Sequence, residues 1–165
     1  MTTEDKNGSK GSKKVTRRGF GLLTGGAIVG GSVFAANWFN ITAEAGGEGR
    51  ITVGQAHQGA TGGEIFLIDI RRPDEWQRTG VGEGAYPLDM RRKDFTDALL
   101  EVTKGDRSAP VALICARGVR SRKMTIRLQE AGFTNIIDVP EGMLGSGAGP
   151  GWLKSDLPVK AYAGG

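Results

Sequence analysis

Three short apolar runs, separated by segments with helical spacing, constrain the fold of this chain more than any other feature. The runs are residues 65–70, 111–114 and 135–139, and a fourth, at 85–88, lies between the first two. The first three are continuous rather than alternating, which is typical of strands buried on both faces of a parallel sheet. Strands that alternate with helices at this spacing predict an α/β fold with a parallel central sheet and helices on both faces.

Helical signals lie in the intervals between the apolar runs. Thr52 and Gln55 have the spacing of a capping box at the start of a short helix that should end near Gly59. Asp94 is expected to cap a helix whose apolar face carries Phe95, Ala98, Leu99 and Val102. A further helix is predicted over residues 121–130, with Ser121 near its start and with Met124, Leu128 and Ala131 facing the core.

Residues 1–45 differ in composition from the rest of the chain. A lysine-bearing start ends at Arg17-Arg18, no charged residue lies between Gly19 and Ala43, and Ala43-Glu44-Ala45 is a small-x-small cleavage site. The run from Thr16 to Leu22 resembles a twin-arginine export signal. We therefore expect residues 1–45 to be a twin-arginine-type signal peptide, and residues 46–165 to be a single domain exported to a bacterial periplasm.

An uncleaved N-terminal anchor in the inner membrane is the alternative for this leader. The uncharged stretch is long enough to cross a bilayer of about 30 Å. The intact mass of the protein, purified from its native envelope, would distinguish the cleaved chain from the anchored one.

The charge and the cysteine count exclude several classes of protein. The formal net charge is +4, but residues 1–45 hold six basic and three acidic residues, and the remaining 16 basic and 15 acidic residues nearly balance. A body so close to neutral does not favour a nucleic-acid partner. With one cysteine and one histidine, the chain cannot form an internal disulfide and lacks the ligands of a Cys/His zinc site.

The only cysteine, Cys115, closes the apolar run 111–114, and a predicted helix begins shortly after it. Ligands of open parallel sheets bind beyond the carboxyl ends of the strands. A loop there can turn its N–H groups inward, and the positive end of the next helix adds to them, so an anion and the thiolate form of the cysteine are both favoured. Several loop residues suit the binding of an anion. Gly118 permits the backbone turn, Arg117 and Arg120 add positive charge, and Ser121 can cap the helix that follows. A lone cysteine without such neighbours is usually an inert core residue.

Three motifs resemble those of rhodanese-like sulfurtransferases. Cys115-Ala116-Arg117-Gly118-Val119-Arg120-Ser121 resembles the active-site loop of that family. Residues 67–76, a strand followed by Asp-x-Arg and an acidic-aromatic pair, resemble its second signature, and residues 141–142, 152–153 and 157–159 resemble its closing segment. The resemblance extends over roughly residues 50–160 and implies the rhodanese-like fold.

The resemblance also implies an activity. The Cys115 thiolate would take the sulfane sulfur of a donor such as thiosulfate, become a persulfide, and pass the sulfur to a thiol, sulfite or cyanide. The loop amides of Ala116 to Arg120, including that of Val119, would hold the persulfide, and Arg117 would meet the anionic substrate. Arg120 would pair with Glu75, while Asp69 and Arg71 would support the pocket floor. This chemistry needs neither a metal nor an organic cofactor, and a protein could serve as sulfur donor or acceptor.

Two segments depart from the family pattern. Gly80-Val81-Gly82-Glu83-Gly84-Ala85 stands where the family often has Gly-His-Ile-x-Gly-Ala. The glycine-rich residues 142–151 form a longer connection than usual. This connection is either a mobile linker or a cover over the Cys115 loop that sets access to it.

Three other functional interpretations fit these residues less well. Phosphatases of related fold use Cys-x5-Arg, whereas four residues separate Cys115 from Arg120, which favours a pocket for one sulfur atom. An exported sulfur-carrier or binding module of the same fold, without turnover, is the second. The third makes His57 a general base, although an ordinary surface histidine fits its position before the first strand better.

Overall fold

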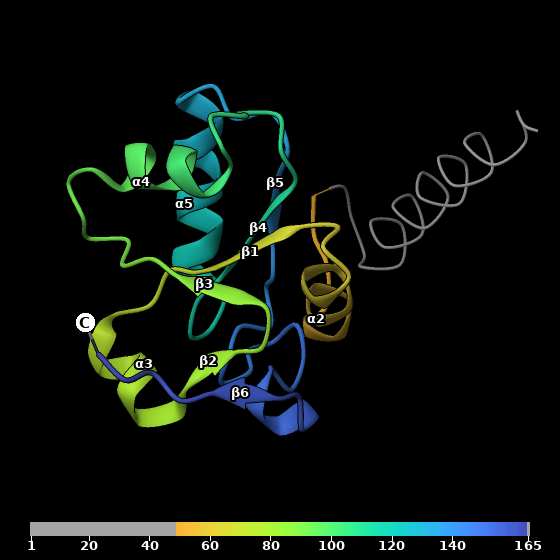
Figure 1. Ribbon diagram of the computed structural model, residues 1–165. Coiled ribbons are helices and arrows are strands. Elements are labelled where there is room, and N and C mark those ends of the chain that lie inside the picture. The colour runs from red at the N-terminus through yellow and green to blue at the C-terminus, as the bar shows by residue number, and fades with distance from the viewer. Residues whose placement is uncertain (1–48, 165) are drawn as a thin grey trace, which may run out of the picture. The chain divides into compact units, whose positions relative to one another are not determined.

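The computed structural model describes residues 49–164, which are built around one parallel sheet (Figure 1). Its strands run in the order β3-β1-β4-β5, and every neighbouring pair is parallel. They are β1 (Phe66–Asp69), β3 (Ala85–Pro87), β4 (Val111–Ile114) and β5 (Ile136–Asp138). The four apolar runs therefore form the sheet, and the predicted α/β fold with a parallel central sheet is confirmed.

The predicted leader, residues 1–45, lies outside the described residues, so its export and cleavage stay predictions of the sequence. Between residues 49 and 164, none of the helices has both the length and the hydrophobicity required to cross a bilayer.

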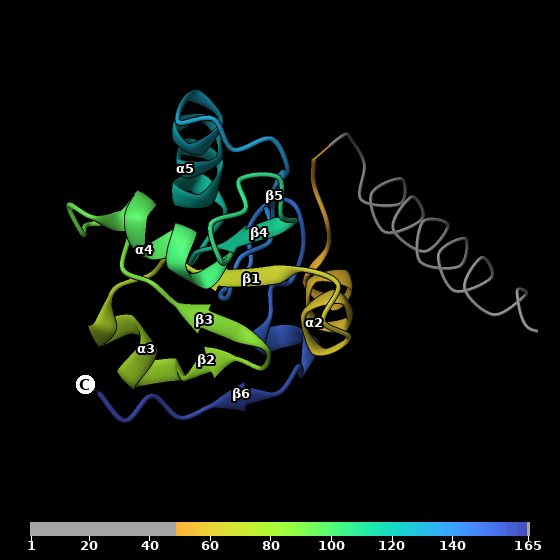
Figure 2. The same cartoon turned by 45° about the horizontal axis from the view of Figure 1, so that its top comes forward.

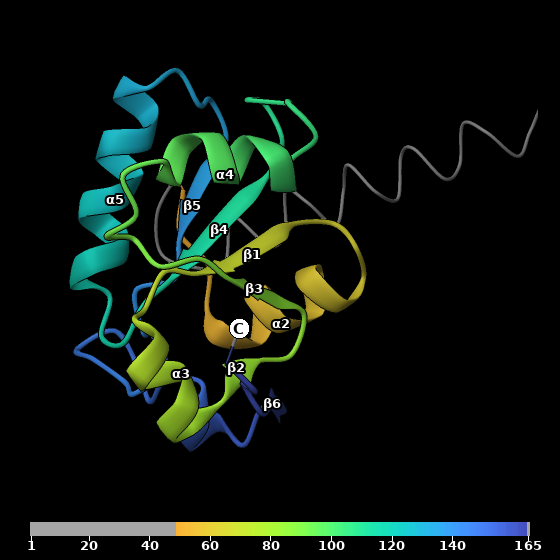
Figure 3. The ribbon, with the colours of Figure 1, turned by 60° about the vertical axis from the view of Figure 1, so that its left-hand side comes forward.

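Successive side chains of the strands enter two separate cores, one on each face of the sheet. On one face, Ile68 and Leu113 pack with α4 (Phe95–Val102) and α5 (Val119–Glu130). On the other face, Leu67 and Ile114 pack with α2 (Val53–Thr61). Figure 3 shows α4 and α5 on one side of the sheet and α2 on the other. Because both faces are covered, every residue of β4 is buried, which explains the continuous apolar run.

The starts of the helices agree with the sequence only in part. Thr52 and Gln55 form the predicted capping box, although α2 continues beyond Gly59 to Thr61. Asp94 occupies the N-cap position of α4 but makes no capping hydrogen bond, because its carboxylate pairs with Arg92 at 2.6 Å.

Helix α5 begins earlier than predicted. Its first residue is Val119, so Ser121 lies within the first turn and does not cap it. The helix ends at Glu130, and Gly132 then turns the chain with a φ of +87°. Ala131 is exposed as a result, and its predicted place in the core is wrong.

A second, two-stranded sheet attaches the C-terminal segment (residues 152–162) to the domain. Strand β2 (Val81–Gly82) pairs antiparallel with β6 (Val159–Lys160), and the two lie side by side in Figure 2. The fully buried Trp152 directly precedes the 3-10 turn η1 (Leu153–Ser155). Its Nε1 donates to the carbonyl of Pro158, beyond the turn, at 2.9 Å.

Gly82 is the residue that makes room for Trp152. A Cβ atom at position 82 would lie 2.8 Å from two ring atoms of Trp152, closer than side-chain carbons approach one another. Residues 80–85 depart from the family pattern by having glycine at position 82. The packing requires it, because a larger residue there would displace the indole of Trp152.

Replacement of Gly82 by alanine is expected to loosen the C-terminal segment. Because the neighbour is a buried aromatic ring rather than a flexible side-chain end, Gly82→Ala should lower the free energy of unfolding by about 1–3 kcal/mol. Gly147→Ala is the matched control, since a Cβ at that exposed site meets no atom within 4 Å, and it should change stability by less than about 0.5 kcal/mol. Urea unfolding of both variants checks this, and equal effects would show that the ring does not confine position 82.

Candidate active site

Cys115 follows β4 directly, at the carboxyl end of the sheet, and its side chain is only 1% exposed. Its Sγ donates a weak hydrogen bond to Ser121 Oγ at 3.6 Å, and Ser121 Oγ donates in turn to the carbonyl of Gly118 at 3.0 Å. The thiol therefore lies beneath the loop of residues 116–118 and the first turn of α5.

The loop above the thiol turns directly into α5. Gly118 precedes the helix with a φ of +78°, a left-handed conformation that glycine adopts without strain. A side chain at this position would also overlap the carbonyl of Pro140. The first N–H groups of a helix have no acceptor within the helix, so those of Val119, Arg120 and Ser121 are available to an anion.

Residues 142–144 hold this loop from its other side. Met143 N–H donates to the Cys115 carbonyl at 2.8 Å, and Leu144 N–H donates to the Ala116 carbonyl at 2.9 Å. In a trans peptide the N–H points opposite to the carbonyl. The N–H groups of Ala116 and Arg117 are therefore turned away from residues 142–144, and the start of the glycine-rich connection is a packed support for the loop rather than a mobile linker.

Glu75 of α3 (Pro73–Thr79) and Arg120 of α5 form the ion pair expected from the sequence. Nη1 and Nη2 of Arg120 donate to the carboxylate, at 2.7 and 2.6 Å. Arg72 N–H adds a third hydrogen bond at 3.0 Å. Chiefly because of the bond from Arg120, the pKa of Glu75 falls from 4.5 to about 2, so the pair remains ionised at neutral pH.

Asp69 and Arg71 form a second, fully buried pair at the end of β1. Arg71 Nη2 lies 2.7 Å from Asp69 Oδ2, and the same guanidinium donates to Thr79 Oγ1 at 2.8 Å and to the Gly80 carbonyl at 2.7 Å. These contacts fasten the C-terminal end of α3 to the sheet. The pair thereby fixes the position of the helix that carries Glu75.

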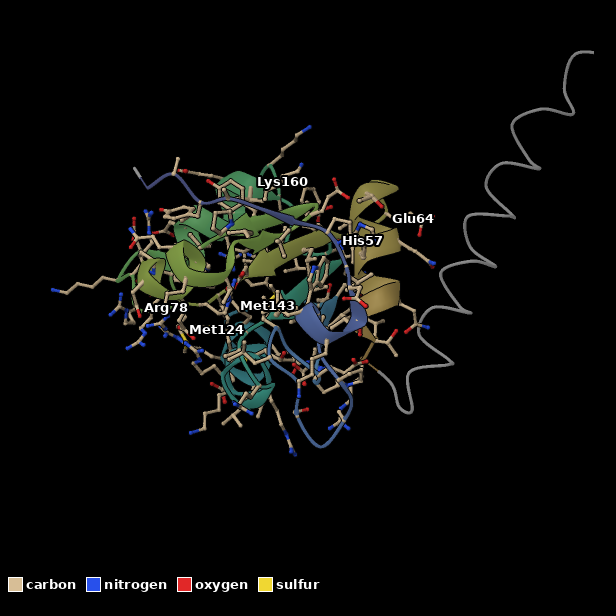
Figure 4. The ribbon with its side chains drawn as sticks, turned by 90° about the horizontal axis from the view of Figure 1, so that it is seen from below. His57, Glu64, Arg78, Met124, Met143 and Lys160 are labelled. Carbon is tan, nitrogen blue, oxygen red and sulfur yellow. The ribbon has the colours of Figure 1, made fainter. Side chains whose placement is uncertain are left out.

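Arg117 and His57 occupy very different places. Arg117 is exposed in the loop beside Cys115, and it makes no ion pair or side-chain hydrogen bond with residues 49–164. His57 lies on α2, 3.1 Å from Glu83 and edge-on to Trp152. Figure 4 shows His57 on the opposite side of the ribbon from Met124 of α5. The histidine thus contacts the C-terminal segment and does not belong to the Cys115 site.

Asp138, at the end of β5, is a residue near the site that the sequence analysis treated only as part of a strand. It is 5% exposed, and its Oδ1 atom has no hydrogen-bond partner among the described residues. Burial raises the pKa of Asp138, while Ser121, Arg50 and Arg122 oppose that shift more weakly. The available signal was a carboxylate next to the last position of an apolar run, as at Asp69. Within residues 49–164, no cluster of His, Cys, Asp and Glu could hold a metal ion.

Comparison with solved structures shows the same fold. The chain superimposes on the polysulfide-sulfur transferase homodimer of Wolinella succinogenes with a TM-score of 0.52 and 22% identity, over 82% of this chain and 90% of that one. The rhodanese-like domain of the Alr3790 protein from Anabaena sp. gives a TM-score of 0.54 at 15% identity, over 70% of this chain and 81% of that one.

Similar sequences occur in two bacterial proteins. An uncharacterized protein of Rickettsia rickettsii is 27% identical over 99 residues, which are 56% of this chain and 80% of that protein. The tRNA sulfurtransferase of Vibrio cholerae is 31% identical over 74 residues, but these are only 15% of that larger protein. The family described as Rhodanese-like domain matches residues 52–145, which include the Cys115 loop and the Glu75–Arg120 pair. The chain therefore belongs to the rhodanese-like domain family.

Proposed function

We propose that this protein is a sulfurtransferase that carries sulfane sulfur on Cys115. The observation that carries the proposal is the position of the only cysteine, at the carboxyl end of β4 beneath a loop whose N–H groups are turned away from its supporting segment. Membership of the rhodanese-like family supports it, and sulfur transfer is the activity in the name of the Vibrio cholerae relative.

The first half-reaction loads the cysteine. After the thiol has lost its proton to water, the Cys115 thiolate attacks the outer sulfur of thiosulfate; a new S–S bond forms, the bond to the sulfite sulfur breaks, and sulfite leaves with the electron pair. The Ser121 hydroxyl, which accepts from the thiol, can then turn and donate to the anionic sulfur. The loop amides and the first turn of α5 stabilise the terminal persulfide charge without rearrangement, because the loop is already held in place.

The second half-reaction returns the enzyme to its starting state. A thiolate, sulfite or cyanide attacks the terminal persulfide sulfur, the Cys115 S–S bond breaks, and the cysteine leaves as a thiolate. No oxidant or reductant is consumed, because one sulfur atom moves between two nucleophiles. The 1% exposure of Cys115 favours donors whose reacting end is a single narrow atom.

Replacement of the nucleophile tests this proposal directly. Cys115→Ser should abolish thiocyanate formation from thiosulfate and cyanide, because the weaker nucleophile cannot form a persulfide, while the circular dichroism spectrum stays that of the folded protein. Wild-type protein treated with thiosulfate should gain the mass of one sulfur atom, which can reside only on the single cysteine.

His57→Gln is the matched control for that experiment. It removes the only histidine, which contacts Glu83 and Trp152 rather than the Cys115 loop, and turnover should stay within about twofold of wild type. Turnover that survives in Cys115→Ser would overturn the persulfide mechanism, and so would turnover lost in the histidine variant alone.

Arg117 is proposed to make the first contact with anionic donors, because its charge is exposed and unpaired within the described part of the chain. Arg117→Ala should raise KM for thiosulfate several-fold and change kcat less, since the loss affects encounter and binding more than bond cleavage. Arg78→Ala removes the same charge from an exposed position on α3 and should leave KM unchanged. An identical KM in the wild type and Arg117→Ala would show that Arg117 does not make the first contact with the donor.

The Glu75–Arg120 pair is proposed to brace the loop, and its contribution should depend on pH. A carboxyl whose pKa is lowered by folding stabilises the protein fully above its unfolded value, and that stability is lost as the pH falls through 4.5 toward about 2. Glu75→Gln should therefore lower the free energy of unfolding by about 2 kcal/mol near neutral pH. The difference from wild type should vanish near pH 2, as measured by urea unfolding.

Asp74→Asn, on the same helix, is the control for that series. Its pairs with Arg72 and Arg78 are exposed, so the variant should change stability by less than about 1 kcal/mol at any pH. A Glu75→Gln difference that stays constant from neutral to acid pH would contradict the assigned ion pair.

A further inference from the structure

The segment that follows β3 reaches the same edge of the sheet as Cys115. Strands β3, β1 and β4 are parallel neighbours, so their carboxyl ends lie together (Figure 1). Leu88 N–H donates to the Asp69 carbonyl at 2.9 Å, and the Leu88 side chain belongs to the same buried cluster as Cys115. Met90 packs against that cluster as well. The next residue, Arg91, therefore lies at the rim of the cysteine site.

Arg91 is held in one position by Asp89. Its Nε donates to Asp89 Oδ1 at 3.0 Å, its Nη2 donates to Oδ2 at 2.6 Å, and its backbone N–H donates to Oδ1 at 3.0 Å. Chiefly because of the side-chain bonds from Arg91, the pKa of Asp89 lies below its usual value, so the pair stays ionised at neutral pH. A guanidinium that is already fixed loses little conformational freedom when it binds a ligand.

The buried Asp69–Arg71 pair has the same geometry but uses its donors differently. Arg71 also lies two residues after its aspartate, and its backbone N–H, Nε and Nη2 donate to the carboxylate. The same guanidinium also donates to Thr79 and to the Gly80 carbonyl. In Arg91, by contrast, Nη1 has no acceptor among residues 49–164, and the side chain is 60% exposed. The exposed pair therefore presents unused donors to a ligand.

Arg91 and its neighbour Arg92 have different surroundings. Asp74 and Glu75 of α3 are near enough to Arg91 to act on its charge. Arg92 instead pairs with Asp94 at the start of α4, at 2.6 Å. Because Glu75 belongs to the ion pair that braces the cysteine loop, Arg91 lies on the side of the segment that faces this loop, whereas Arg92 lies on the side of α4.

The unused donors of Arg91 suit the oxyanion end of a sulfur donor. Because Cys115 is only 1% exposed, the transferred sulfur atom enters the site first and the rest of the donor stays at the rim. In thiosulfate that outer part is a sulfonate, whose oxygens form charge-assisted hydrogen bonds with a guanidinium. A polysulfide chain carries no oxygen, and sulfur is a weak hydrogen-bond acceptor. A contact with Arg91 therefore favours thiosulfate over polysulfide.

We propose that Arg91, fixed by Asp89, is a specificity-determining residue that binds the oxyanion end of the sulfur donor while the outer sulfur reaches Cys115. It selects donors of the thiosulfonate class, in which the transferred sulfur is bonded to an oxygen-bearing sulfur, over polysulfides. The use of this contact in turnover rests on the proposed function, whereas the binding of the oxyanion does not.

Thiosulfate binding to protein that cannot react tests the contact. Thiosulfate added to ¹⁵N-labelled Cys115→Ser protein at constant ionic strength should shift the amide resonances of residues 89–92 and 116–121 in a saturable way. Arg91→Ala in this background should weaken binding about tenfold, because a charge-assisted hydrogen bond is lost. Arg92→Ala is the matched control, since it removes the adjacent arginine from an equally short, exposed ion pair, and it should leave the affinity unchanged.

The rate of sulfur loading tests the selectivity. With Cys115 present and the donor below saturation, the gain of one sulfur atom is followed by intact mass. Arg91→Ala should slow loading from thiosulfate about tenfold and loading from polysulfide less than twofold. Arg91→Lys should recover only part of the rate with thiosulfate, because an ammonium group lacks the planar fork that Asp89 holds.

The outcomes separate this proposal from the proposed function. Thiosulfate binding that Arg91→Ala weakens and Arg92→Ala does not would support the contact, even if wild-type protein transferred no sulfur. Binding that Arg91→Ala leaves unchanged, or that both variants weaken equally, would overturn it. Equal slowing with thiosulfate and polysulfide would overturn the selectivity, and full recovery in Arg91→Lys would overturn the function of the fixed guanidinium.

Discussion

Two backbone hydrogen bonds, from Met143 and Leu144 to the carbonyls of Cys115 and Ala116, determine which way the loop after β4 faces. With the carbonyls engaged on one side, the following N–H groups must point to the other, because the peptide is planar and trans. Glycines at 118 and 142 permit the close contact, since a side chain at either position would collide with the opposite backbone. The orientation of the amides is therefore present in the folded protein before any anion arrives, which is the condition for electrostatic preorganisation.

Two side-chain ion pairs also hold the loop after β4 in place. The buried Asp69–Arg71 pair ties the end of α3 to β1, and α3 in turn presents Glu75 to Arg120 at the start of α5. The loop is thus held between the sheet, the glycine-rich connection and α3. Removal of one partner of a buried pair leaves an uncompensated charge, so these residues cannot be exchanged singly without cost.

The sequence predicted the parts of this arrangement that depend on local patterns. Continuous apolar runs identify strands covered on both faces, and the spacing from Cys115 to Ser121 identifies the loop, so both were found. Asp94 occupies the predicted N-cap position but makes no capping hydrogen bond, because Arg92 pairs with its carboxylate. The start of α5 was misplaced because Gly118 turns the chain sooner than a serine cap implies. Neither the contact between Gly82 and Trp152 nor the burial of Asp138 could be predicted, because each depends on contacts between distant segments.

The single buried cysteine has a consequence for the chemistry of oxidation. A persulfide on a chain with no second thiol cannot be resolved into an internal disulfide, so the stored sulfur waits for an outside acceptor. Two copies would likewise have to bring their sulfurs to about 2.05 Å to crosslink, and a thiol exposed by only 1% beneath a fastened loop cannot approach another so closely. The same burial that restricts the substrate protects the domain from covalent dimerisation in oxidising surroundings.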